Sequence, residues 1–210
     1  MPSDTFLNLP KEKQNKILDS AILEFSHNDY EVVSINKIIY NANIPRGSFY
    51  MYFKDKEDLY TYILNSYRKR LDDLVFSLLE EENGDFLLIS EKLYDKIIFF
   101  CENDEDRFLF EKFFKNLRFS EENKFLAKPT KLEFTSFKSK VLELIDKKMY
   151  KYSSDDELFD SFMFVIFVTI SGVIDYITNR EIFNKQNYLN RLNIIKYGIY
   201  RKEERNENIN

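Results

Sequence analysis

Hydrophobic residues recur every three to four positions along most of this 210-residue chain, which is the spacing of one face of an α-helix. The longest such stripe comprises Leu59, Ile63, Tyr67, Leu71, Leu74 and Leu78. No segment of useful length alternates between apolar and polar residues as a half-buried strand would. With only four glycines and four prolines, the pattern predicts an all-α protein.

Breaks between the apolar runs divide the chain into a series of helices. The first is expected at about residues 10–25, and a long one runs from Lys56 to about Asn83-Gly84. Between them, residues 34–53 hold two short helices. Further helices are predicted at 86–102, 105–118, 129–150, 156–179 and 185–203, with breaks at Lys128-Pro129 and Tyr152-Ser153-Ser154. We expect a small head, residues 1–55, and a larger body, residues 56–210.

The two short helices are joined by a tight turn. Ser34 is a suitable N-cap, because its hydroxyl can accept a hydrogen bond from a backbone N–H of the first turn. Asn43 can adopt the left-handed conformation that closes a helix. Pro45 suits the first turn of the next helix, where its missing N–H costs nothing. Helix, short turn and helix is the arrangement that places a second helix in the major groove of DNA.

The second short helix has an inner and an outer face. Phe49 and Phe53 are four positions apart and are predicted to point inward. The residues left to point elsewhere are Arg46, Ser48, Tyr50 and Met51. The first three offer hydrogen-bonding groups that suit a DNA groove.

This stretch resembles the DNA-binding signature of the TetR family of bacterial transcriptional regulators. The matching run is Ala42-Asn43-Ile44, Pro45-Arg46-Gly47-Ser48-Phe49-Tyr50, Met51-Tyr52-Phe53 and Lys54-Asp55-Lys56-Glu57-Asp58-Leu59. The likeness covers about residues 10–65, and the remainder agrees in length and helical character without a motif. Departures include Asn43 in place of the usual turn glycine, Ile39 in place of a small residue, His27-Asn28-Asp29 where a glycine is usual, and Met51 in place of a polar or aromatic residue.

The resemblance implies a homodimer that binds double-stranded DNA at a near-palindromic operator. Arg46 would donate to a guanine edge or a phosphate, and Met51 would contact a thymine methyl. Ser34, Tyr52 and Lys56 would anchor phosphates. The full set of predicted DNA contacts is Ser34, Lys37, Arg46, Gly47, Ser48, Tyr50, Met51, Tyr52 and Lys56.

Charge is unevenly distributed between the two predicted parts. The net charge of the chain is −5, but residues 1–70 hold ten basic and nine acidic residues, whereas residues 71–210 hold 21 and 27. The basic residues near the motif are Lys37, Arg46, Lys54 and Lys56. Charges more than about 10 Å from the phosphates are screened. An acidic body would face away from DNA, although solvated helix faces alone would give the same split.

The body is rich in phenylalanine. Ten of the 21 phenylalanines fall between Phe99 and Phe137, more than one helix face can hold. For any single residue core packing is sufficient, but the set suits an apolar cavity for a small hydrophobic effector, which the resemblance also implies. The predicted ligand-binding residues are Phe99, Phe110, Phe113, Phe114, Phe137, Phe162 and Phe167.

Residues 159–177 are apolar nearly all round, so this helix is expected to be buried on two sides. Its uncharged run, residues 161–174, is shorter than the roughly 20 residues that span a membrane, and no membrane association is expected. One side can pack in its own body and the other in a dimer, with a central core helix of a monomer as the alternative. The predicted dimer contacts are Phe164, Val168, Ser171, Gly172, Leu192, Ile195 and Ile199.

An enzyme is not favoured by the inventory of reactive side chains. There is one histidine, His27, and one cysteine, Cys101, so we expect no catalytic site, metal or cofactor. A lone cysteine and the lack of an apolar leader suit the cytoplasm. The sequence therefore predicts a ligand-responsive DNA-binding regulator, and specifically a repressor that its effector releases from DNA. The alternatives are a helical ligand-binding protein of this fold that has lost DNA recognition, and an enzyme built on a helical bundle.

Overall fold

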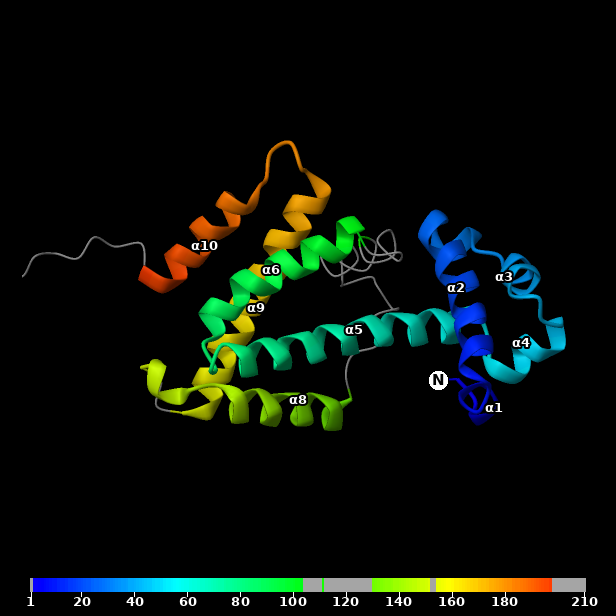
Figure 1. Cartoon of the computed structure of the whole chain (residues 1–210), viewed down its shortest axis with the longest axis horizontal. Coiled ribbons are helices and arrows are strands. Elements are labelled where there is room, and N and C mark those ends of the chain that lie inside the picture. The colour runs from blue at the N-terminus through cyan, green and yellow to red at the C-terminus, as the bar shows by residue number, and fades with distance from the viewer. Residues whose placement is uncertain (1, 104–110, 112–129, 152–153, 198–210) are drawn as a thin grey trace, which may run out of the picture.

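The computed structural model describes residues 2–103, 111, 130–151 and 154–197, and these residues form helices and connecting turns without a strand. Figure 1 shows an elongated molecule in which a small head and a larger body are joined by one long helix, α5. The head comprises α1 (Asp4–Leu7), α2 (Lys11–His27), a 3-10 turn (Tyr30–Val32), α3 (Ile35–Ala42) and α4 (Arg46–Tyr52). The all-α prediction is confirmed for the described residues.

Aromatic side chains fill the core of the head. Phe49 and Phe53 are buried as predicted, and Phe6 of α1 packs on Phe53 with ring centroids 4.7 Å apart. The sequence pattern did not reveal α1, whose four residues are too few for a periodic signal. Its start is fixed to the end of α4, because the Ser3 backbone N–H donates to the Tyr52 carbonyl at 2.9 Å and the Ser3 hydroxyl donates to the Met51 carbonyl at 2.6 Å.

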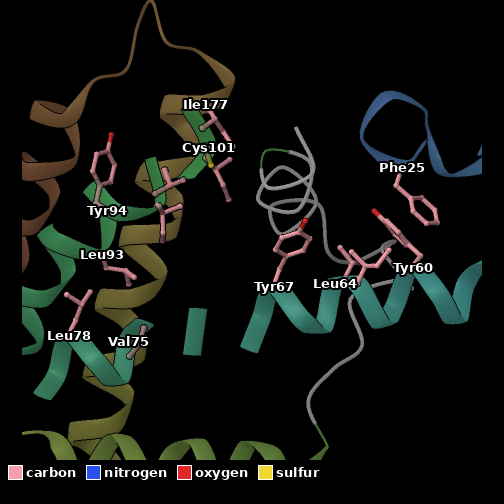
Figure 2. Close-up of a cluster of buried hydrophobic side chains, with 14 of the residues drawn as sticks. Phe25, Tyr60, Leu64, Tyr67, Val75, Leu78, Leu93, Tyr94, Cys101 and Ile177 are labelled. Atoms are coloured by element: carbon pink, nitrogen blue, oxygen red, sulfur yellow. The ribbon is translucent and has the colours of Figure 1, made fainter. Parts of the chain in front are cut away.

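Helix α5 (Lys56–Glu81) belongs to both parts of the molecule. Near its start, Tyr60 packs on Phe25 of α2 with ring centroids 4.6 Å apart. Further along, Val75 is buried in the body, and Figure 2 follows this row of buried side chains along the helix. The predicted end is confirmed: Gly84 has a φ of +80° and donates to the Leu79 carbonyl at 2.8 Å. A Cβ at Gly84 would lie 2.2 Å from the backbone nitrogen of Asp146, so a side chain cannot be accommodated there.

The body is built from α6 (Phe86–Asn103), α8 (Lys131–Leu144), α9 (Asp155–Thr178) and α10 (Lys185–Tyr197), with α9 packed against the other three. The helix predicted over 129–150 ends at Leu144, because the chain turns extended at Ile145. A 3-10 turn, Lys147–Met149, follows. The helix predicted over 105–118 lies outside the described residues except at residue 111, and the break at Lys128-Pro129 lies outside them altogether.

Tyr188 ties three body helices together. Its hydroxyl lies 3.1 Å from that of Thr169 on α9 and donates to the Ser90 carbonyl on α6 at 2.7 Å. Its ring stacks on Tyr94 with centroids 4.3 Å apart. Burial raises the pKa of the Tyr188 hydroxyl to about 12, so the group stays protonated as a donor at neutral pH. This network fixes α10 against the α6–α9 pair.

Among the described helices, α9 is long and apolar enough by composition to cross a membrane, with a mean hydropathy of 1.8 over its most apolar window. Core helices of soluble proteins meet the same criterion. Here α9 contacts α6, α8 and α10, and the buried residues include Phe162, Val165 and Thr169. The prediction that this segment is buried is confirmed for one side of the helix, and its other side carries exposed phenylalanines.

Candidate nucleic-acid interface and ligand cavity

Local backbone chemistry positions α3 and α4 as predicted. The Ser34 hydroxyl accepts from the Lys37 backbone N–H at 3.4 Å and caps α3. Asn43 closes α3 in the left-handed conformation, with φ 52° and ψ 51°. Pro45 stands at the N-cap of α4, one position before the first turn in which it was expected, and Arg46 begins the helix. The ends of the two helices are thus set by residues that lie within the motif itself.

The outer face of α4 is available to a partner. Arg46 and Gly47 are exposed, as are Tyr50 (48 %) and Met51 (57 %), while Ser48 is half-buried. A Cβ at Gly47 would meet nothing within 4 Å, so only a surface from outside the molecule can approach this backbone closely. The Arg46 guanidinium donates to the Asn36 side-chain carbonyl at 3.1 Å. Asn36, which the sequence pattern did not single out, therefore holds Arg46 on the outer face.

Two predicted DNA contacts are engaged within the head. Tyr52 is only 4 % exposed and packs on Phe6, with ring centroids 6.0 Å apart. The Lys56 ammonium donates to the carbonyls of Tyr30, Glu31 and Val33 at 2.5, 3.2 and 3.3 Å. It therefore satisfies carbonyls of the 3-10 turn and fixes that turn to the start of α5. Both residues remain predicted DNA contacts, but each already has a structural role.

Lys37 extends from α3 with an exposed side chain and forms an ion pair with the buried Glu24 at 3.6 Å. The same Glu24 carboxylate accepts from the Ser34 backbone N–H at 3.2 Å. Lys37 and Ser34 therefore share a partner at the start of α3. This arrangement leaves the Lys37 side chain at the surface of the head, where it was predicted to contact DNA.

The body contains an apolar cavity of about 370 Å³ between α5, α6, α8 and α9. Its apolar wall includes Leu71, Val75, Leu93, Ile97, Phe134, Phe137, Met163, Ile166 and Ile170. Three charged residues, Arg68, Asp72 and Glu133, lie on its lining as well. The volume is in the range of small-molecule sites, which combine apolar walls with a few polar groups.

Phe137 is the predicted ligand-binding residue that the structure places on the cavity wall. Phe162 is fully buried behind it, with ring centroids 6.4 Å apart, and so forms core rather than lining. Phe99 and Phe167 are exposed by 60 % and 68 % and do not line the cavity. Phe110, Phe113 and Phe114 lie outside the described residues.

The charged groups of the cavity were missed by the sequence analysis. Arg68 and Asp72 are one turn apart on α5. Arg68 forms an ion pair with Glu133 of α8 at 3.2 Å, and Glu133 completes the capping box of that helix by accepting from the Thr130 backbone N–H at 2.7 Å. Burial raises the pKa of the Asp72 carboxyl to about 6, although the nearby Arg68 opposes the shift. The signal available in sequence was only the i, i+4 spacing of the two α5 residues.

The residues predicted for the dimer contact separate into two groups. Phe164 is 56 % exposed and Val168 half-buried on the outer side of α9. Gly172 lies inside the body instead: a Cβ there would come within 2.8 Å of the Tyr188 ring, so its small size serves the α9–α10 packing within one chain. Of the others, Leu192 is buried, Ile195 is half-buried, Ser171 accepts from Arg191 at 3.4 Å, and Ile199 lies outside the described residues.

Comparison with known proteins assigns the family. Residues 17–63 match the family model described as bacterial regulatory proteins of the tetR family. Residues 85–199, more than half of the chain, match the model described as the tetracyclin repressor-like C-terminal domain. The chain belongs to the TetR family of transcriptional regulators. The class is therefore that of DNA-binding transcriptional regulators, and not of enzymes.

Individual relatives agree with this assignment. An uncharacterized HTH-type transcriptional regulator of Bacillus subtilis, YdgC, is 29 % identical over 98 residues, which cover 45 % of this chain and 50 % of that protein. The matched stretch thus spans about half the length of this curated relative. A TetR-family transcriptional regulator of Syntrophomonas wolfei has the same fold, with a TM-score of 0.58, 19 % identity and coverage of 92 % and 99 % of the two chains.

The fold is also that of the Bacillus subtilis regulator FadR, which was solved in complex with stearoyl-CoA. This likeness has a TM-score of 0.53 and 16 % identity and covers 89 % of this chain and 99 % of that one.

Proposed function

We propose that this protein is a ligand-responsive transcriptional regulator that binds a near-palindromic operator as a homodimer and is released by a small apolar effector. The observation that carries the proposal is the path of α5. Its first turns pack on the head through Tyr60, and its later turns line the cavity through Leu71 and Val75. A ligand in the cavity therefore touches the same helix that holds the DNA-binding head.

In the proposed complex, α4 enters the major groove with its exposed face toward the bases. Arg46, held by Asn36, donates to a guanine edge or a phosphate, and Met51 contacts a thymine methyl. The open space over Gly47 lets the DNA backbone approach the start of α4. Ser34 and Lys37 contact phosphates from the start of α3 and set the register on the duplex.

The homodimer is proposed to form through the outer side of α9. Phe164 and Phe167 are exposed there, one turn apart, and Ile194 and Tyr197 are exposed on the neighbouring α10. Two copies related by a two-fold axis would bury these faces in a four-helix interface. A dimer also places two heads on one duplex, which a near-palindromic operator requires.

Effector binding would shift the equilibrium between two conformations of the dimer, which differ in the position of α5. A ligand that fits the cavity better in one position of α5 favours that position and changes the separation of the two heads. The proposed boundary between head and body, at residues 55 and 56, falls where α5 begins, so this helix transmits the change. The proposed target is double-stranded operator DNA, and the proposed location is the bacterial cytoplasm.

The proposal is tested by selecting bound sequences from a random duplex pool with purified protein at moderate salt. We expect an enriched palindrome whose half-sites lie one helical turn, about 10–10.5 base pairs, or a multiple of it apart. Enrichment of a single, unrepeated half-site would overturn the dimeric mode. Failure to enrich any sequence, with the protein folded and freed of ligand by refolding, would favour a ligand-binding protein that has lost DNA recognition.

A further inference from the structure

The mouth of the apolar cavity carries an excess of negative charge. Arg68, Asp72, Glu133 and Phe137 line the 370 Å³ cavity and also an adjoining outer cleft of about 810 Å³. These four residues therefore stand where the buried tail of an amphipathic ligand would meet its headgroup. We call them the throat. With one cation and two carboxylates, its net charge at neutral pH is negative.

Two of the three charges in the throat are paired. The Arg68 guanidinium meets one oxygen of Glu133 at 3.2 Å, and the other Glu133 oxygen accepts from the Thr130 backbone at 2.7 Å. By contrast, no hydrogen bond or ion pair to the Asp72 carboxylate is found among the described residues, although Arg68 lies close enough to attract it. A partly buried carboxylate without a bonded partner bears a desolvation cost that a cation can offset. The raised pKa of Asp72 agrees with this geometry.

We propose that the cavity takes an amphipathic ligand with an apolar tail and a cationic headgroup, and that the Asp72 carboxylate receives the headgroup. This inference rests on the proposed effector function of the same cavity. An anionic headgroup at the throat would instead face both Asp72 and Glu133. Lys69 and Lys140, which could attract an anion, line only the outer cleft and not the apolar cavity.

The test compares probes that share a ten-carbon tail and differ in headgroup charge. Decyltrimethylammonium, decanol and decanoate are titrated calorimetrically below their micelle concentrations. We expect the ammonium to bind about ten-fold or more tightly than decanoate, because the coupling free energy of a close charge pair is large enough to change affinity by this factor. The affinity for decanol should lie between those for the ammonium and decanoate, because decanol carries no charge.

A pH series isolates the protein group, because a quaternary ammonium does not titrate. The charged groups that face Asp72 are Arg68, Asp73 and Glu133. Protonation of Asp72 removes the attraction, so affinity for decyltrimethylammonium should rise as pH increases from 5 to 8. The affinity for decanol should not change over the same range, which controls for a general change in the cavity.

Asp72→Asn keeps the shape of the side chain and removes its charge. It should lower the affinity for the ammonium by about ten-fold and leave decanol binding unchanged. Asp73→Asn is the matched control, because the neighbouring Asp73 is exposed and lines only the outer cleft. An equal loss in both variants would overturn the assignment to Asp72.

The outcomes separate this inference from the proposed function. Tighter binding of decanoate than of the ammonium would overturn the cationic headgroup and leave the effector cavity standing. If no probe of any charge bound, the effector role of the cavity would be overturned together with its charge preference. The operator selection described above would still report on DNA binding independently.

Discussion

The head and the body place their functional groups in opposite ways. In the head, the outer side chains of α4 are exposed on a short helix whose caps lie within a few residues of it. In the body, the cavity is assembled from α5, α6, α8 and α9, and its charged groups come from α5 and α8. A surface site can be recognised from a local run of residues, whereas a cavity is defined by helices that are distant in sequence.

Within each part of the molecule, residues that stabilise the fold lie beside residues that are available to a partner. Tyr52 and Lys56 lie within the motif that resembles a DNA-binding signature, yet one packs in the aromatic core and the other bonds to three carbonyls. A motif therefore combines residues that hold the head together with residues that face outward. In the body, Phe162 and Phe137 are likewise neighbours with different roles, one in the core and one on the cavity wall.

The largest expected effect tests whether the body joins two heads. Phe164→Glu with Phe167→Glu places two charges on the exposed side of α9 and should give a monomer by analytical ultracentrifugation. Operator affinity should fall by about 10²- to 10⁴-fold, because the second half-site contact is no longer intramolecular. Leu132→Glu, at an exposed position of α8, is the control and should leave the oligomeric state unchanged. A double variant that stays dimeric would show that α9 is not the interface.

Phe162→Ala tests whether Phe162 is core or ligand contact. Truncation of this fully buried ring should lower the free energy of unfolding by about 3–5 kcal/mol, measured by urea denaturation. Phe99→Ala, at an exposed position, should cost less than about 1 kcal/mol. Similar costs at the two positions would contradict the burial that distinguishes them.

Arg46→Ala tests base reading by the head. If Arg46 donates to a guanine with two hydrogen bonds, the variant should lose about 1–3 kcal/mol of operator affinity and accept any base at that position. Asn36→Ala should have a smaller effect in the same direction, since Asn36 only positions the guanidinium. Binding assays on the selected operator and on a guanine-substituted site measure both effects. Full wild-type specificity in Arg46→Ala would exclude a base contact from this residue.

Gly47→Ala separates folding from DNA binding at one position. The new methyl group meets nothing within 4 Å, and alanine is more favourable than glycine in a helix, so stability should rise by about 0.5–1 kcal/mol. Operator affinity should nevertheless fall, because the methyl group occupies space that the DNA backbone needs. Thermal denaturation and a binding titration test the two expectations. Unchanged DNA binding would mean that the duplex does not approach this point.

The smallest expected effect concerns the pH dependence of the empty cavity. The pKa of Asp72 is raised from 3.8 to about 6 in the folded protein, so the folded state holds this proton more tightly than the unfolded state does. The contribution of Asp72 to the free energy of unfolding therefore decreases as pH rises from about 4 to about 6. Above about pH 6 the full cost of burying the ionised carboxylate remains. Asp72→Asn should raise the melting temperature more at pH 7.5 than at pH 4, as followed by scanning fluorimetry. An equal shift at both values would contradict the raised pKa.

Much of the head could be predicted because its signals are local. The hydroxyl of Ser34 and the backbone of Asn43 act within one turn of the helix they terminate, so the residues alone define the ends of α3. The four-residue spacing of Phe49 and Phe53 likewise indicated that both side chains point inward, although Phe53 is the extended C-cap that follows α4. The end of α5 at Glu81 follows from the same kind of signal, since Asn83 and Gly84 just beyond it adopt positive φ angles.

The remaining features depended on how the helices pack. The periodic pattern showed that α9 is apolar all round, but it did not show that Gly172 would meet Tyr188 of the same chain rather than a partner. It did not single out Arg68 and Asp72 of α5, and the proximity of Glu133 to Arg68 arose only when α8 packed beside that helix. The sequence by itself determined helix ends, helix faces and the outward side chains of the motif, because these follow from backbone and side-chain geometry within a few residues. Only the tertiary structure decided the cavity and its charge, because both depend on which helices pack together and at what register.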